Sequence, residues 1–166
     1  MSARRGLPWF SAAAAIGTAH AAASLYWALG GDVLVETVGT WAVDWRAGDP
    51  LAVGLALGAI GVAKLAGAWV PWAAARAGGP RRALRVACWL GATLLTAYGL
   101  SNTLVANLAL TGALGAVDNV VAMQGHAWLW DPLFLAWGLT LGVGLWRTRP
   151  RRPAPRGQAA VAVSGR

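Results

Sequence analysis

The stretch PLAVGLALGAIGVAKLAGAWVPWAAAR, residues 50–76, decides the fold of this chain. It is apolar throughout, except for Lys64 near its middle and the arginine that ends it. A helix needs about 20 consecutive apolar residues to cross a membrane. Asp49 and Pro50 open the stretch with the residue types favoured at an N-cap and at the first helical position. The stretch therefore predicts a membrane-spanning helix that carries one charge deep inside it.

The composition of the whole chain agrees with a membrane protein. Of its 166 residues, 57% are hydrophobic and only 12% are charged, and the mean hydropathy is +0.52. A soluble domain usually has about twice that charged fraction. The length suits one domain. The single cysteine, Cys88, excludes an intramolecular disulfide and any CxxC motif, and we expect it to be a small buried apolar residue.

Four apolar runs predict an all-α fold, an integral membrane four-helix bundle. The expected spans are residues 9–30, 51–74, 84–114 and 132–146. The third is longer than a bilayer requires, so it tilts or extends beyond the lipid. A cleaved signal peptide is the alternative for the first run, because Ala19-His20-Ala21 resembles a cleavage site. We favour an uncleaved helix, since the apolar run continues to full helix length.

The charged residues orient this bundle. Twelve of the 13 arginines precede the first span, join the second to the third, or follow the fourth: Arg4, Arg5, Arg76, Arg81, Arg82, Arg85, Arg147, Arg149, Arg151, Arg152, Arg156 and Arg166. All six acids fall in the other two loops: Asp32, Glu36, Asp44, Asp49, Asp118 and Asp131. Positive residues stay on the cytoplasmic side. Both termini are therefore predicted to be cytoplasmic, in a multi-pass protein of the cell membrane.

The net charge of +8 does not indicate a nucleic-acid partner. The arginines flank apolar runs, and no basic face with interleaved aromatic residues accompanies them. The expected partner is the lipid bilayer. Residues 147–166 form a basic tail that we expect to be disordered and to reach anionic lipid heads. The outer loop, residues 32–49, is either a hairpin or a short helix in the membrane interface, and we favour the helix.

Lys64 is the first candidate for a functional residue. It lies about 21 Å along the helix from Pro50, near the middle of the bilayer. Inserting a lysine there costs about 2.5–3.5 kcal/mol, so such residues usually face the bundle interior and have a partner. A lysine that extends toward the head groups is the alternative, but its side chain is several ångströms too short at this depth.

Other polar residues lie at a similar depth. His20 shares a helix face with Ser24 and Trp27, and Tyr98 and Asn102 are one turn apart on the third span. If they converge with Lys64, they form a polar ligand-binding pocket. The alternative is that each only joins neighbouring helices by a hydrogen bond. No cofactor is indicated.

Polar residues of the outer loops are a second candidate site, for a cation or a cationic head group: Asp32, Glu36, Asp118, His126 and Asp131. For Asp131, helix capping before Pro132 is a sufficient explanation. No spacing here is a recognised metal motif. Two glycine pairs, Gly54 with Gly58 and Gly138 with Gly142, have the spacing that lets membrane helices approach closely. They predict packing or association with a second copy or another membrane protein.

Three segments carry a family resemblance: HAAASLYWALGG (residues 20–31), ETVGTWAVDW (36–45) and HAWLWDPLFLAWGL (126–139). They resemble an uncharacterised family of small actinobacterial membrane proteins, a domain of unknown function with a YWALGG-like signature, over residues 9–146. This chain has Glu36 where the family has Asp. The resemblance implies four helices, no established activity, and a shared design that includes His20, Trp27, His126 and Asp131.

Three functions remain open from the sequence. The leading hypothesis is a membrane protein that binds or passes a small or lipid-like ligand through a polar intramembrane pocket. The second is a membrane-embedded enzyme acting on a lipid or isoprenoid, with Lys64 or His20 as the acid or base. The third is an accessory subunit of a larger membrane complex.

Overall fold

The computed structural model describes residues 2–149, and these form helices joined by turns and short loops, with no strand among them. The elements are α1 (Ser2–Ala28), a 3-10 turn η1 (Val35–Thr37), α2 (Thr40–Gly48), α3 (Pro50–Arg76), α4 (Arg82–Leu110), α5 (Val120–Gly125), a π-helical turn η2 (His126–Trp130) and α6 (Asp131–Arg147). The predicted all-α class is confirmed. The basic tail lies, from residue 150 onward, outside the described residues.

Within residues 2–149, three helices are long and apolar enough to cross a membrane: α3, α4 and the continuous helix Val120–Arg147. The helix that holds the expected first span, α1, has 27 residues but is not among them. Ser11, Thr18, His20 and Ser24 interrupt its apolar run and lower its hydropathy.

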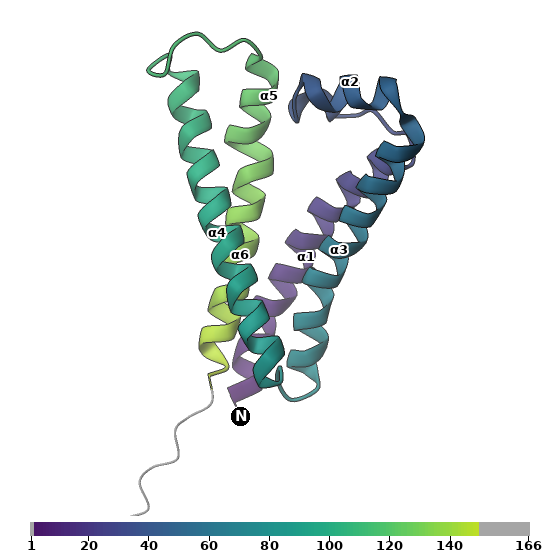
Figure 1. Ribbon diagram of the computed structural model, residues 1–166. Coiled ribbons are helices and arrows are strands. Elements are labelled where there is room, and N and C mark those ends of the chain that lie inside the picture. Colours follow the sequence, from purple (N-terminus) through teal and green to yellow (C-terminus); the bar gives the residue numbers. More distant parts are fainter. Residues whose placement is uncertain (1, 150–166) are drawn as a thin grey trace, which may run out of the picture.

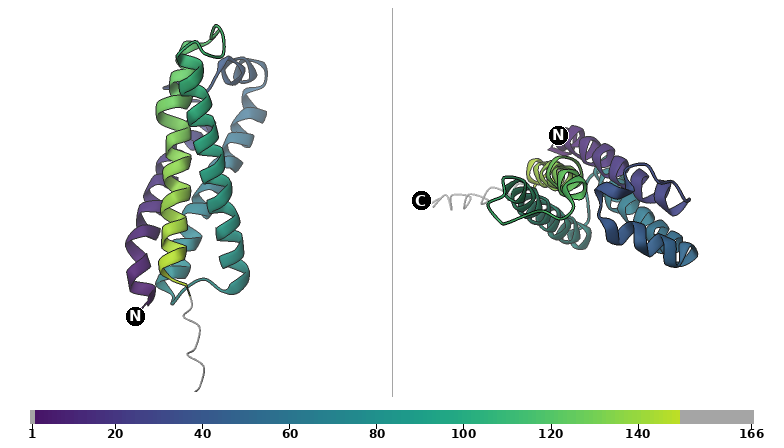
Figure 2. Two further views of the ribbon diagram at one scale, coloured as in Figure 1. Left: turned by 90° about the vertical axis from the view of Figure 1, so that its left-hand side faces the viewer. Right: turned by 90° about the horizontal axis from the view of Figure 1, so that it is seen from above.

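The long helices form two pairs, α1 with α3 and α4 with α6 (Figure 1). The pairs lie together where α1 begins and diverge toward α2 (Figure 1), as the view from above in Figure 2 also shows. The start of α1, the α3–α4 turn and the end of α6 lie at one end of the molecule. The α1–α3 connection, which holds four of the six acids, and the α4–α5 loop, which holds Asp118, lie at the other. The separation of arginines from loop acids along the sequence therefore matches the two ends of the fold.

Regular stripes of buried residues explain how these helices pack. In α1 the stripe advances by alternating steps of four and three residues: Gly6, Phe10, Ala13, Gly17, His20, Ser24 and Trp27. In α4 the buried residues follow the same register and are all small: Cys88, Ala92, Gly99, Ala106 and Ala109. Alternating steps of three and four are typical of helices that pack side by side at a shallow angle.

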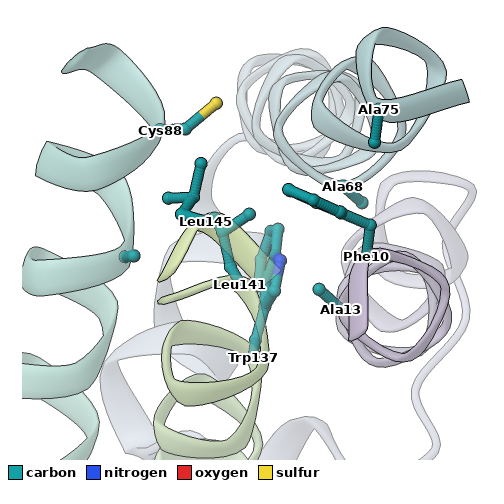
Figure 3. Close-up of a cluster of buried hydrophobic side chains, with 9 residues drawn as sticks. Phe10, Ala13, Ala68, Ala75, Cys88, Trp137, Leu141 and Leu145 are labelled. Atoms are coloured by element: carbon teal, nitrogen blue, oxygen red, sulfur yellow. The ribbon is translucent and has the colours of Figure 1, made fainter. Parts of the chain in front are cut away.

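The core near the arginine-rich end draws on all four long helices (Figure 3). Phe10 of α1 and Leu145 of α6 are fully buried there, and Trp137 and Cys88 point into the same cluster. Cys88 is a buried free thiol, as expected. A smaller cluster near the opposite end joins Trp27 to Trp130 and to the loop residue Val35. The two apolar clusters leave the middle of the bundle to polar residues.

The predicted glycine contacts lie within the chain. A Cβ on Gly138 would meet Thr96 N of α4 at 2.6 Å, and one on Gly54 would meet Ala28 O of α1 at 3.0 Å. Gly99 of α4 is packed more closely than either of these, because a Cβ there would come within 2.4 Å of Leu135 N of α6. These glycines therefore serve intramolecular packing, and association through the faces of Gly54/Gly58 and Gly138/Gly142 stays a prediction.

Two helix ends test the sequence-based boundaries. The predicted N-cap at Asp49 is confirmed, because its Oδ1 accepts a hydrogen bond of 3.0 Å from Ala52 N. Helix α4 ends at Leu110, four residues before the predicted boundary at residue 114. Gly112 follows with φ +79°, a left-handed conformation that ends helices. In the outer loop, the favoured helix is present as α2 rather than a hairpin.

The expected fourth span needs a larger correction. Its helix begins at Val120, not Pro132, and runs unbroken to Arg147. Asp131 does not cap a helix end: it lies inside this helix and is 1% exposed. Pro132 marked a helix start in the sequence because it lacks an N–H and its ring clashes with the carbonyl four residues earlier. The π-helical turn at His126–Trp130 precedes it directly, and such a turn accommodates a proline inside a helix.

We predict opposite effects for two glycine substitutions in α4. Gly99→Ala forces α4 away from α6 and lowers the free energy of unfolding by about 1–3 kcal/mol. Gly91→Ala meets no atom within 4 Å and stabilises the helix by up to about 1 kcal/mol. Thermal denaturation in detergent, followed by tryptophan fluorescence, measures both. Equal melting temperatures for the two variants would contradict the close α4–α6 approach.

Candidate functional site

Lys64 lies at the centre of a polar cluster between α1 and α3. Its Nζ is 3.1 Å from His20 Nδ1 and donates a hydrogen bond of 2.8 Å to Ser24 Oγ. His20 and Ser24 are 5% and 2% exposed, and Lys64 is half-buried. We call Lys64, His20 and Ser24 the Lys64 cluster. The residues that the sequence placed at similar depths on two helices are thus in direct contact.

The buried faces of α1 and α3 explain the position of this cluster. His20 and Ser24 are consecutive members of the buried stripe of α1. Lys64 lies between Gly61 and Ala68, the buried residues of α3 that face the same way. A Cβ on Gly61 would come within 2.6 Å of the Leu25 side chain, so the two helices are close at this level. Lys64 therefore lies on the face of α3 that packs against α1, and its side chain reaches the residues of α1.

Two aromatic residues, Trp130 of η2 and Phe134 of α6, lie against the cluster on a third side. The Phe134 ring centroid is 3.9 Å from that of His20 and 5.6 Å from Lys64 Nζ. The Trp130 ring, one turn earlier, lies 5.7 Å from the His20 ring. An ammonium near the face of an aromatic ring is attracted to it. Sequence reasoning missed both aromatic residues, because a Phe or Trp in an apolar helix carries no signal beyond packing.

The other predicted pocket residues do not join the Lys64 cluster. Tyr98 is 53% exposed. Its ring packs against that of Phe134, with 5.5 Å between the two centroids, and Phe134 in turn contacts the Lys64 cluster. Trp27 is buried, but its Nε1 donates to Val33 O at 2.9 Å and so holds the loop after α1. Asn102 is half-buried, and within residues 2–149 no hydrogen bond joins it to Lys64. The cluster is therefore smaller than the predicted set.

An apolar groove between α3 and α4 leads toward the Lys64 cluster. It has a volume of about 510 Å³, and its lining includes Gly67, Leu95 and Trp137. Each of these residues is three positions from a residue at the level of the cluster: Lys64, Tyr98 and Phe134 respectively. Residues three apart on a helix are neighbours on one face. The groove therefore reaches to within about one helical turn of the polar centre.

The charge of Lys64 has no acidic partner in the described part of the chain, where the only ion pair joins His126 to Asp131. Charged lysine only donates hydrogen bonds, so His20 Nδ1 accepts and the neutral imidazole carries its proton on Nε2. His20 Nε2 is buried without a hydrogen-bond partner. Lys64 has three N–H groups and uses two, so one donor and one positive charge remain for a ligand.

The outer-loop candidates separate into exposed residues and a pair in which Asp131 is buried and His126 is half-buried. Asp131 Oδ2 is 3.0 Å from His126 Nδ1, and His126 Nε2 is 3.1 Å from Val38 O of the outer loop. His126 and Asp118 line a pocket of about 380 Å³, and Asp118, Asp32 and Glu36 are all exposed. Among the described residues, no three His, Cys or acidic side chains gather to hold a metal ion. His126 thus connects the outer loop, through Val38 O, to Asp131 at the start of α6.

We predict that His126→Ala destabilises the protein by about 1–3 kcal/mol, because it leaves the buried Asp131 carboxylate without its partner. Asp131→Asn in the same variant restores part of the loss, since a neutral amide costs less to bury than a charge. Thermal denaturation in detergent measures both, with the exposed Asp118→Asn as the control. A His126→Ala melting temperature equal to that of the control would contradict a structural role for the pair.

Comparison with known proteins identifies a family without identifying an activity. A family model described as "Protein of unknown function (DUF3995)" matches residues 17–141, which include the Lys64 cluster and the His126–Asp131 pair. No curated protein and no solved structure matches the chain. The chain belongs to the DUF3995 family of proteins of unknown function.

Proposed function

We propose that the chain is a four-span protein of the cell membrane that binds a lipid-like ligand at the Lys64 cluster. In this proposal α1 is the fourth span, uncleaved, and both termini are cytoplasmic. The observation that carries the ligand proposal is the contact of Lys64 Nζ with His20 Nδ1 at 3.1 Å and with Ser24 Oγ at 2.8 Å.

Several features support α1 as a span. Its 27 residues extend about 40 Å as a helix, enough to cross a hydrocarbon core of about 30 Å. Its buried stripe packs against α3 and against α6, the last part of the membrane-length helix Val120–Arg147. The ends of the long helices that carry the described arginines lie together at one end of the fold (Figure 1). The positive-inside rule then favours a cytoplasmic location for that end.

The environment of Lys64 supports an anionic head group. A positive charge inside a membrane is costly without a partner. Among residues 2–149, the hydrogen-bond and ring contacts of Lys64 Nζ are all with neutral groups: His20 Nδ1, Ser24 Oγ and the Phe134 ring. A carboxylate or phosphate would supply the missing negative charge. A charge-assisted hydrogen bond to it would be about twice as strong as a neutral one.

The groove between α3 and α4 supports a long apolar tail. Its lining is almost entirely apolar, from Leu84 near the arginine-rich end to Leu95 near the level of the cluster. Those eleven positions correspond to about 17 Å of helix, about the length of one lipid leaflet. The combination of a positive polar centre and an apolar groove matches an anionic amphiphile, with its head at Lys64 and its tail between the helices.

An enzyme remains the second candidate, because two titratable groups, Lys64 and His20, are in hydrogen-bond contact. General acid–base catalysis requires groups within this reach of each other or of the substrate. A binding protein keeps its ligand intact, whereas an enzyme releases a changed product. The accessory-subunit alternative predicts that Lys64→Met leaves both stability and phenotype intact.

The topology proposal predicts the labelling of introduced cysteines in intact cells. In a Cys88→Ala background, Thr40→Cys reacts with a membrane-impermeant maleimide, because the outer loop faces outside. Gly79→Cys, in the α3–α4 turn, reacts only after the cells are opened. Labelling of Gly79→Cys in intact cells would overturn the proposed orientation.

The ligand proposal predicts the cross-linking of palmitic acid that carries a diazirine in its chain. In bilayers, ultraviolet light should attach this probe to peptides lining the α3–α4 groove, as mapped by mass spectrometry. Lys64→Met should lower this labelling about tenfold or more, the effect of losing a hydrogen bond to a charged group. Ala63→Met, which changes the neighbouring exposed position, is the matched control and should label as the wild type does.

The methyl ester of the same probe separates head-group recognition from simple partitioning into lipid. It lacks the carboxylate, so its labelling of the groove should be weak and insensitive to Lys64→Met. Equal labelling by the acid and its ester, or equal labelling of wild type and Lys64→Met by the acid, would refute the proposal.

A further inference from the structure

A second groove lies between α4 and α6, away from the Lys64 cluster. It has a volume of about 670 Å³. Small residues, Ala92, Thr96 and Gly142, form part of its lining, together with the larger Leu139 and Trp146. We call it the Arg147 groove, after the arginine that lines its end. Nothing in the proposed function uses it, and none of its lining residues belongs to the Lys64 cluster.

The length of the Arg147 groove matches one lipid leaflet. On α6 its lining residues extend from Gly138 to Arg147, nine positions that rise about 14 Å. Half of a hydrocarbon core of about 30 Å is about 15 Å. On α4 the lining extends from Trp89 to Ala97, about 12 Å. The groove therefore begins at the arginine-rich end of the fold and ends near the middle of the bilayer, as an acyl chain does.

Aromatic rings hold two guanidinium groups at the mouth of this groove. The Arg149 Cζ lies 3.7 Å from the centroid of the Trp146 ring and 5.6 Å from that of Trp89, and both rings line the groove. The Arg147 Cζ lies 5.4 Å from the Trp9 ring. Within residues 2–149 neither arginine forms an ion pair. Stacking on a ring fixes a guanidinium while leaving its edge N–H groups for a phosphate.

We propose that the Arg147 groove binds an anionic phospholipid, with one acyl chain in the groove and its phosphate at Arg147 and Arg149. Charge complementarity favours this occupant, since two arginines without an acidic partner lie at the depth of the head groups. A guanidinium can bind two phosphate oxygens through parallel hydrogen bonds. A zwitterionic phospholipid offers the same chain and phosphate but no net negative charge, so it binds more weakly.

The test is a comparison of two phospholipids with identical acyl chains. The purified full-length protein in detergent is titrated with phosphatidylglycerol or phosphatidylcholine, and the lipid-bound fraction is measured by native mass spectrometry. Phosphatidylglycerol should bind about tenfold more tightly or better. Each of Arg147→Gln and Arg149→Gln should reduce this preference about fivefold, as expected for one basic residue at a membrane surface.

Two further variants give the test its controls. Arg76→Gln removes an arginine that is also stacked on a tryptophan, 5.0 Å from the Trp72 ring, but that lies outside the Arg147 groove, so the preference should not change. Gly142→Leu fills the groove and should weaken both lipids. The fold accommodates it, because a Cβ there meets only the Trp89 ring, at 3.9 Å.

Three outcomes would overturn the proposal. Equal binding of the two lipids removes the role of charge. An Arg76→Gln effect as large as that of Arg147→Gln shows a diffuse attraction without a site. A dimer of the wild type that Gly142→Leu converts to a monomer, with lipid binding unchanged, assigns the groove to a second copy of the chain.

Discussion

The ammonium group of Lys64 is the constraint on which the middle of this bundle depends. It belongs to a helix that is otherwise apolar from Pro50 to Trp72. A lysine in such a position costs several kcal/mol unless the protein provides partners. Both hydrogen-bonding partners, His20 and Ser24, come from α1. The register between α1 and α3 is therefore set by polar contacts as well as by the small residues around them.

The apolar parts of the fold depend on the close packing of small side chains rather than on polar contacts. Glycines let α4 and α6 approach so closely that a Cβ on Gly99 would lie 2.4 Å from a backbone nitrogen of α6. Membrane helices gain little from the hydrophobic effect against each other, so close packing of small residues is their main attraction. The same small residues leave grooves between neighbouring helices, and both proposed lipid sites include such a groove.

Much of this arrangement was predictable from the sequence. Counting residues from the ends of the apolar runs placed Lys64 and His20 at one depth, and helical spacing placed His20 and Ser24 on one face. That Tyr98 and Asn102 do not join the Lys64 cluster was not predictable, because equal depth does not decide which way a side chain points around its helix. The role of Phe134 left no trace in the sequence, since an aromatic residue in an apolar run has the same pattern whether it packs on lipid or on a lysine.

The largest error concerned Asp131, and its cause is general. Asp followed by Pro has the pattern of a helix start, and at Asp49 the same pattern was correct. At Asp131 the helix continues through the proline because the preceding turn widens. The result is a carboxylate buried inside a helix long enough to cross the membrane, paired with His126. A π-helical turn has no reliable sequence signal, so only the three-dimensional structure could reveal the pair.

The contact between Lys64 and His20 can be measured directly, because the chain contains a single lysine and two histidines. Solid-state NMR of the protein in lipid, with ¹⁵N in the lysine side chain and ¹³C in the histidine rings, reports magnetisation transfer between them. We expect transfer to one histidine, lost in His20→Gln and kept in His126→Gln, since Lys64 Nζ lies 3.1 Å from His20 Nδ1. Absence of transfer to either histidine in the wild type would contradict the buried Lys64 cluster.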